Sequence, residues 1–96
     1  MTKILKDNEI DKIEKNKLVL AGGCFDVIHQ AHIEFLEKSK SEGKILVLLL
    51  ESDENIKRIK GNDRPLNNQL VRAENLSKLN IVDYIILLNM PDSSHY

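Results

Sequence analysis

The sequence has no tryptophan and only two phenylalanines and two tyrosines. So few aromatic side chains exclude an aromatic stacking platform for single-stranded nucleic acid. The formal net charge is −1, so no overall positive field attracts nucleic acid or anionic lipid. We therefore expect neither a nucleic-acid partner nor a membrane partner.

The sequence also has little cysteine and no long apolar run. Its one cysteine, Cys24, excludes an internal disulfide framework and suits a reducing cytoplasm, where we expect the protein to act. The longest apolar run, ILVLLL at 45–50, is far shorter than the roughly 20 residues that cross a bilayer. The N-terminal segment MTKILKDNEIDKIEKNK mixes both charges and resembles no signal peptide. The length of 96 residues, with 42% apolar and 30% charged residues, predicts one globular domain over residues 1–96.

Short apolar runs punctuate the chain. The runs at 18–21 (LVLA), 44–51 (KILVLLLE) and 83–88 (DYIILL) are continuous, as in buried parallel strands. Residues 89–96 show no pattern and are expected to form an irregular tail.

Helical patterns lie between and before these runs. Residues 9–15 predict a short polar helix with Ile10 and Ile13 inward, and residues 53–59 predict one or two helical turns. Helical spacing also begins near Ala31 and stops at Gly43. A further helix, capped by Asn67 or Asn68, is predicted to run to about Asn80, with four inward side chains: Leu70, Ala73, Leu76 and Leu79.

The alternation of strands with helices predicts an α/β fold with a parallel sheet and right-handed crossovers. Three strands and two helices amount to half of a doubly wound sheet. In such sheets ligands bind beyond the carboxyl ends of the strands. The carboxyl end of the first predicted strand carries GGCFDVIHQAH, residues 22–32, which is therefore the candidate site.

The residue types in this stretch suit a phosphate. Gly22 and Gly23 let the backbone approach a ligand closely. The helix start that follows offers unpaired amides and a positive dipole end. His29 and His32 flank that start, and imidazoles can donate hydrogen bonds to charge that grows on phosphorus.

Other interpretations remain open from the residues alone. A histidine near a helix start often only caps the helix or packs. His29 and His32 could instead share a metal with Cys24 and Asp26, although the spacing matches no closed zinc pattern. Cys24 beside a strand end suits a packed small residue better than a nucleophile. The sequence contains no GxGxxG or Walker pattern, so the common dinucleotide and P-loop sites lack support.

GGCFDVIHQAH resembles the signature of the cytidylyltransferase-like nucleotidyltransferases, in which G-[CT]-F-D ends a strand and H-x-G-H follows. KGNDRPLNNQLVRAENLSKLNIVDYIILL, residues 60–88, is similar to the K-G-x-x-R-P and V-D segments of the adenylyltransferase domain of ADP-heptose synthases. Glycerol-3-phosphate cytidylyltransferase and archaeal FAD synthetase are more distant relatives. The resemblance covers about residues 9–88 and implies a Rossmann-like nucleotidyltransferase fold.

The resemblance implies a reaction. A phosphate oxygen of a small substrate, such as a sugar 1-phosphate, attacks the α-phosphorus of ATP or CTP, and pyrophosphate leaves. Mg²⁺ accompanies the triphosphate, and AMP is the expected transferred group. In this chain the implied catalytic residues are His29, His32 and Lys60.

The resemblance also implies binding residues. Those for the nucleotide are Gly22, Gly23, Cys24, Phe25, His29 and His32. Those for the phosphorylated substrate are Asp26, Lys60, Arg64 and Arg72, with a helix-surface ion pair as the other interpretation of Arg72. Lys57 and Arg58 are expected on a solvated helix face, and no residue is assigned to a metal.

The sequence departs from the family pattern in two places. Ala31 replaces the glycine of H-x-G-H, and its methyl group is expected to push the nucleotide back. The C-terminal strands of the family fold are expected to be lacking, which leaves the first predicted strand with a free edge. Free edges favour pairing, so we expect a homodimer. The alternative function is a catalytically impaired nucleotide-binding or assembly protein.

Overall fold

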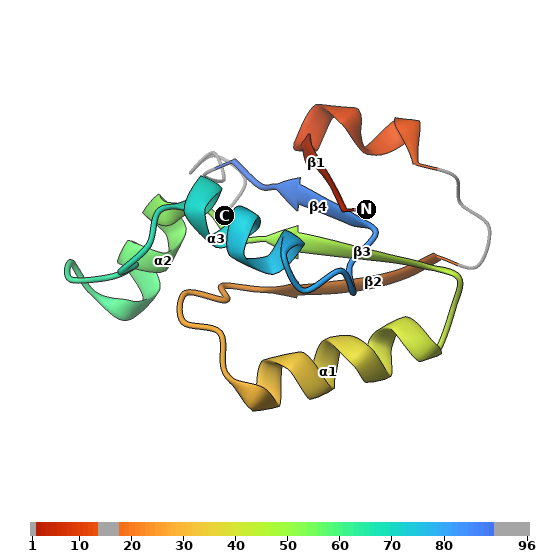
Figure 1. Ribbon diagram of the computed structural model, residues 1–96. Helices are drawn as coiled ribbons and strands as arrows, with labels where there is room; N and C mark the ends of the chain where they lie inside the picture. The colour runs from red at the N-terminus through yellow and green to blue at the C-terminus, as the bar shows by residue number, and fades with distance from the viewer. Residues whose placement is uncertain (1, 14–17, 90–96) are drawn as a thin grey trace.

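The computed structural model describes residues 2–13 and 18–89 of the chain (Figure 1). Its strands are β1 (Lys3–Lys6), β2 (Leu18–Gly23), β3 (Ile45–Leu50) and β4 (Tyr84–Leu87). Its α-helices are α1 (Gln30–Ser41), α2 (Asp53–Lys60) and α3 (Gln69–Ser77), and η1 (Asp7–Lys12) is a 3₁₀ helix. The three strands and the helices between them that the apolar pattern predicts are all present.

One sheet with the order β1-β4-β3-β2 forms the centre of the fold, and each neighbouring pair of strands is parallel. Between β2 and β3 the register is unbroken from Leu18, opposite Ile45, to Gly23, opposite Leu50. An all-parallel sheet joined by helices is the predicted α/β architecture. In the described ranges β2 pairs with β3 alone, so the predicted free edge at residues 18–21 is found.

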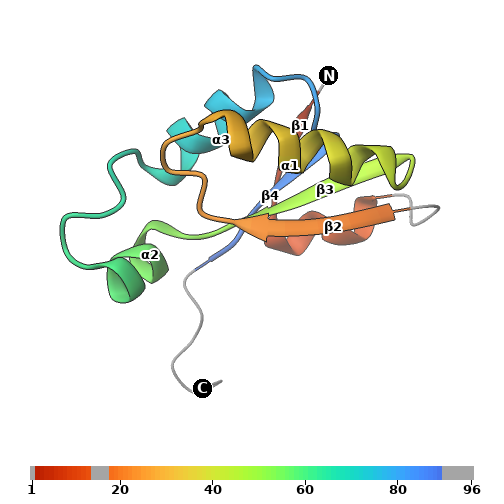
Figure 2. The same ribbon diagram turned by 90° about the horizontal axis from the view of Figure 1, so that it is seen from below.

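The two faces of the sheet are covered differently. Figure 2 shows α1 and α3 on one face and η1 on the other. In β3, Leu46, Val47, Leu48 and Leu50 are 0% exposed, because this strand is covered on both faces. Burying each such side chain contributes about 1.5–3 kcal/mol to folding. The carboxyl end of β3 is thus firmly packed, and the loops at this end of the sheet rest on it.

The helices that lie near the carboxyl ends of the strands begin at side-chain caps. Ser52 accepts a hydrogen bond from the backbone N–H of Asn55 at 3.1 Å, which starts α2. Asn68 accepts one from Val71 at 2.9 Å, so the predicted cap of the third helix is Asn68. The Asn68 cap fixes the end of the loop 61–68 that leads into α3. This loop projects with α2 beyond the sheet (Figure 1).

The sequence does not predict β1. Its four residues, KILK, hold only two half-buried apolar side chains, Ile4 and Leu5, between exposed lysines. Such a segment carries no periodic signal of its own. It forms a strand because β4 offers it a partner, with Lys3 opposite Tyr84 and Lys6 opposite Leu87.

Three further predictions need correction. The helix predicted at 9–15 is the 3₁₀ helix 7–12; Ile13 after it is buried as predicted, and residues 14–17 lie outside the described ranges. The third helix ends at Ser77 rather than near Asn80. Leu70 is 54% exposed, so its predicted inward position is wrong, because Arg72 occupies the inward face instead. Most of the predicted tail, residues 90–96, also lies outside the described ranges.

Candidate active site

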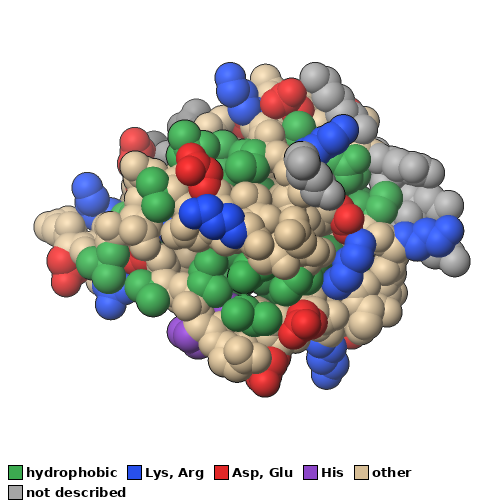
Figure 3. Space-filling model, viewed as in Figure 1, with side chains coloured by type: hydrophobic (Ala, Val, Ile, Leu, Met, Phe, Trp, Pro, Cys, Tyr) green, Lys and Arg blue, Asp and Glu red, His purple; other side chains and the backbone are tan. Residues whose placement is uncertain are grey.

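A cleft of about 490 Å³ lies at the carboxyl end of β2. Every site residue predicted from the sequence lines it except Arg72. Its volume is within the roughly 300–1,000 Å³ of typical small-molecule sites. In the space-filling view, histidine side chains emerge beside the loop that joins β2 to α1 (Figure 3). The residues predicted around the end of β2 and in the segment 60–64 therefore line one cleft.

Two wall residues, Val27 and Phe35, were not predicted. They are 53% and 47% exposed, and they give the cleft an apolar side. A signal for Phe35 existed in the sequence, because it follows His32 by three residues and so lies on the same helix face. Apolar side chains are ordinarily assigned to the core, which is why the pattern did not single it out.

The two histidines converge as predicted. His29 is the N-cap of α1 and His32 is three residues further on. Their ring centroids lie 4.0 Å apart, and the planes are tilted by 30°. The backbone N–H of His29 donates a hydrogen bond to Nδ1 of His32 at 3.3 Å. This acceptor role assigns the proton of neutral His32 to Nε2.

The surroundings of His32 disfavour its protonated form. Burial lowers the pKa of His32 below its ordinary value of 6.5, and the neighbouring His29 and Lys60 lower it further. A hydrogen bond with the backbone of Val27 opposes this without reversing it. Burial, the largest cause, attracts no anion, but the positive charge of Lys60 does, so this part of the cleft suits a phosphate.

We expect acid to destabilise the free protein through His32. In the folded protein the pKa of His32 lies below its ordinary value of 6.5. The stability that neutral His32 contributes is therefore complete above pH 6.5 and is lost as the pH falls through the folded pKa. The urea midpoint of the wild type should therefore fall between about pH 7.5 and about pH 5.5. The midpoint of His32→Gln should fall less, because the glutamine at position 32 does not titrate. An equal fall in both proteins would contradict this prediction.

Phe25 packs against His32 of the cleft wall. Its backbone has a φ of 48°, in the left-handed region that non-glycine residues rarely adopt. Its ring lies 5.0 Å from the ring of His32. A Cβ atom added to Gly23 would lie 2.6 Å from this ring, whereas one added to Gly22 would meet nothing closer than 3.7 Å. Gly23 is thus required by packing, and Gly22 is not.

This difference predicts contrasting results for two alanine variants. Gly23→Ala should displace the Phe25 ring and lower stability by about 1–3 kcal/mol, the usual cost of overpacking. Gly22→Ala should stay within about 1 kcal/mol of the wild type, the range of a strand glycine replaced by alanine. Thermal unfolding measures both. If Gly22→Ala is stable but binds nucleotide weakly, Gly22 is needed for close approach of the ligand to the backbone. Equal stability of the two variants would refute the claim that Gly23 is required by its packing against Phe25.

Asp26 ties the histidine segment to the loop 61–68. Its carboxylate accepts hydrogen bonds from the backbone N–H groups of Leu66 at 2.7 Å and Asn67 at 2.8 Å. The side-chain amide of Asn67 donates to the Asp26 carbonyl at 2.8 Å, and Arg64 lies 3.6 Å from the carboxylate. Burial raises the pKa of Asp26, but these amides and the charges of Arg64 and Arg72 outweigh it and leave the pKa below 3.8. Asp26 therefore holds the loop 61–68, with Arg64, at the cleft.

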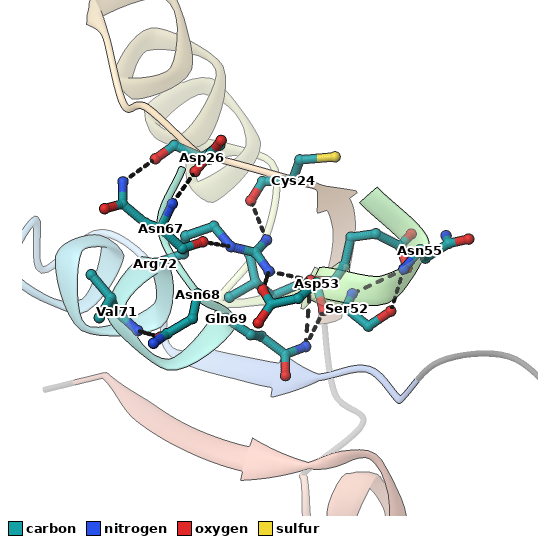
Figure 4. A network of polar contacts seen from close by, with 12 residues as sticks. Cys24, Asp26, Ser52, Asp53, Asn55, Asn67, Asn68, Gln69, Val71 and Arg72 are labelled. Atoms are coloured by element: carbon teal, nitrogen blue, oxygen red, sulfur yellow. Dashed lines mark hydrogen bonds and ion pairs between the residues drawn. The ribbon is translucent and has the colours of Figure 1, made fainter. Parts of the chain in front are cut away.

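Arg72 does not line the cleft. Figure 4 shows its guanidinium between Cys24 and Asp53. Its side chain is 0% exposed, so the helix-surface interpretation is wrong. Its guanidinium donates to Cys24, Glu51, Asn67 and Asp53 instead. A side chain enclosed in this way does not reach a substrate in the cleft, and Arg72 is no longer placed among the substrate ligands.

Two properties of the described residues bear on metals and membranes. Across residues 2–13 and 18–89, no group of three His, Cys, Asp or Glu side chains could hold a metal ion. Cys24 is a free thiol at the edge of the cleft. Within the same ranges no helix is long and apolar enough to cross a membrane.

Comparison with known proteins agrees with this geometry. The cytidylyltransferase-like family matches residues 20–92. The chain is similar to the bifunctional protein HldE of Geobacter metallireducens, with 41% identity over 81 residues that cover 84% of this chain and 16% of that protein. HldE of Aliarcobacter butzleri is 44% identical over 71 residues, or 74% of this chain and 15% of the relative. The chain thus spans less than a fifth of these relatives.

A solved structure is also similar. It is the lipopolysaccharide core biosynthesis protein from Thermoplasma volcanium, with a TM-score of 0.68 and 31% sequence identity. The match covers 82% of this chain and 63% of that one.

Proposed function

Because this chain belongs to the cytidylyltransferase-like family, we propose that it transfers a nucleoside monophosphate from a nucleoside triphosphate to a small phosphorylated substrate. AMP is the proposed group and a sugar 1-phosphate the proposed acceptor, in carbohydrate or lipopolysaccharide synthesis. The similarity to HldE and to the Thermoplasma protein supports this choice. The observation that carries it is the convergence of His29, His32 and Lys60 on one cleft.

The residues of the cleft suit each part of this reaction. An oxygen of the acceptor phosphate forms a bond to the α-phosphorus, and the bond from that phosphorus to the pyrophosphate oxygen breaks. The imidazoles of His29 and His32 would donate hydrogen bonds to the oxygens on which charge grows. Lys60 and Arg64 line the same cleft and would hold the acceptor phosphate. Little else is required of a protein in phosphoryl chemistry beyond such positioning.

Magnesium fits this site as part of the substrate. Both carboxylate oxygens of Asp26 already accept backbone hydrogen bonds, so the cleft residues that the structure describes offer no free carboxylate cage for an ion. Mg²⁺ commonly keeps its waters and binds through the phosphates of its nucleotide. It would supply charge neutralisation for the leaving pyrophosphate.

Ala31 is compatible with this proposal. It is exposed in the first turn of α1 and is not part of the cleft wall, so its methyl group does not narrow the cleft. This observation supports the enzyme over the alternative of a catalytically impaired binding or assembly protein.

Pyrophosphate release tests the proposal. Each of the four nucleoside triphosphates is combined with Mg²⁺ and a panel of sugar and polyol phosphates, and ATP with a sugar 1-phosphate should give the fastest release. Lys60→Met should lose this activity, whereas the matched control Lys57→Met, on the same helix but outside the cleft, should keep it. Nucleotide binding without release from any pair would favour the alternative function. Absence of any nucleotide binding would refute both.

We also infer that the chain associates through β2. Leu20 of this edge strand is 55% exposed. One side of β2 pairs with β3, and the other side faces no strand among the described residues. Pairing with a second copy would satisfy that backbone and bury Leu20 together. Sedimentation equilibrium at micromolar concentration should give a homodimer, and a monomer of 11.0 kDa would exclude it.

A further inference from the structure

A buried arginine joins the segments that build the cleft. Arg72 of α3 uses Nε to donate to the carbonyl of Asn67 at 3.0 Å and Nη1 to donate to that of Cys24 at 2.7 Å. Its Nη2 donates to the carbonyl of Glu51 at 2.9 Å and to the Asp53 carboxylate at 2.6 Å. Figure 4 shows this guanidinium between the segments. A charge is tolerated at 0% exposure only when it is hydrogen-bonded and paired in this way.

Each of its carbonyl partners belongs to a different part of the site. Cys24 is in the cleft wall. Glu51 follows β3, and its own N–H donates to the carbonyl of Gly23 at 3.0 Å. Asn67 lies in the loop 61–68, where Asp26 accepts its N–H. The Arg72 side chain therefore sets the spacing between three segments: the one after β2 at Cys24, the end of β3 at Glu51, and the loop 61–68 at Asn67.

The bond to Cys24 also orients a backbone donor. In a planar trans peptide the carbonyl and the following N–H point in opposite directions. Since the Cys24 carbonyl points at Arg72, the N–H of Phe25 points away from it. Among residues 2–13 and 18–89 no acceptor takes this N–H. Phe25 itself lines the cleft, at a φ of 48° that the surrounding structure must maintain.

We propose that Arg72 is a positioning residue for the nucleotide, which it does not touch. It fixes the Cys24–Phe25 peptide so that the Phe25 N–H is available to a phosphate oxygen in the cleft. The inference rests on the proposed function, because it requires a phosphate ligand there. It assigns this buried arginine a role beyond holding the fold together.

The arginine fork is what this role needs. Its planar guanidinium reaches four acceptors in fixed directions, whereas a lysine ammonium is a point charge on a flexible stem. Lysine at this position keeps the charge for Asp53 but does not span Cys24, Glu51 and Asn67 together. Arg72→Lys therefore separates the charge from the geometry.

Calorimetric titration of Mg–ATP into Arg72→Lys tests the proposal. The measurement is made at a temperature where circular dichroism shows the variant folded. Affinity should fall by about tenfold, the usual effect of losing a hydrogen bond to a charged group. Arg58→Lys makes the same change on the exposed surface of α2 and should leave the affinity unchanged. In turnover, KM for the nucleotide should rise while KM for the acceptor changes little.

Nuclear magnetic resonance gives an independent readout from the wild type. The Phe25 amide resonance should move when inorganic tripolyphosphate is added. If Arg72→Lys is folded and binds Mg–ATP within about threefold of the wild type, the arginine is only structural and the proposal is overturned. If that variant does not fold, an unchanged Phe25 resonance in a wild type that binds Mg–ATP overturns it equally. A wild type that binds no Mg–ATP refutes the proposed function first.

Discussion

Replacing His32 with glutamine is expected to lower kcat by about 10²- to 10³-fold, the usual cost of removing one donor from a developing transition-state charge. Glutamine is chosen because of what His32 does for the helix. Its Nδ1 accepts the backbone N–H of His29 at 3.3 Å, and a glutamine at this third helical position can accept the same N–H. The variant therefore loses the imidazole and keeps the helix start.

The companion variant His29→Asn follows the same logic. His29 is the N-cap of α1, and asparagine is among the best N-cap residues. Both variants should unfold at a temperature close to that of the wild type and bind Mg–ATP with only a moderate loss. Single-turnover rates with saturating substrates separate chemistry from binding. A kcat within about tenfold of the wild type in both variants would show that the histidines only cap the helix.

Replacing Asp26 with asparagine is expected to cost about 3 kcal/mol of stability, since a buried amide then faces backbone donors. Asp26 is 8% exposed, and its two oxygens accept the N–H groups of Leu66 and Asn67. An asparagine offers one oxygen and places its NH₂ against the other donor. For a chain of this size such a loss lowers the melting temperature by about 12–24 °C.

The matched control is Asp63→Asn, an exposed aspartate of the same loop. It should unfold within about 0.5 kcal/mol of the wild type. The pH dependence supplies a second check. The pKa of Asp26 is below its ordinary 3.8, so its stabilisation is present above that value and is lost as the pH falls below it. Urea unfolding should therefore show the wild type and Asp26→Asn converging at low pH, and a constant gap would contradict the role of the carboxylate.

The sequence alone predicts much of the scaffold. A run such as 45–50, six apolar residues with none polar, is typical of a strand buried on both faces, and β3 is such a strand. Once three parallel strands are expected, their carboxyl ends must meet at one edge of the sheet. That is why the position of the cleft and the convergence of His29 and His32 could be predicted without coordinates.

The cap of the third helix could also be predicted from the sequence. Asn68 caps α3 because its side chain can accept a nearby N–H whatever the rest of the fold does. The register of β2 on β3, in contrast, depends on which residues face each other in three dimensions. The apolar pattern predicts a strand but names no partner, so the strand order β1-β4-β3-β2 came only from the structure.

The tertiary structure decided where local signals were weak or misleading. The segment KILK becomes β1 because β4 presents an open edge, a cause that lies some 80 residues away in the chain. Arg72 turns inward and Leu70 outward, opposite to their polarity. Three carbonyls and a carboxylate converge on the guanidinium and make its burial tolerable, and only the folded chain brings them together. A sequence pattern records the polarity of a side chain, whereas the acceptors that compensate a buried charge are a property of the assembled fold.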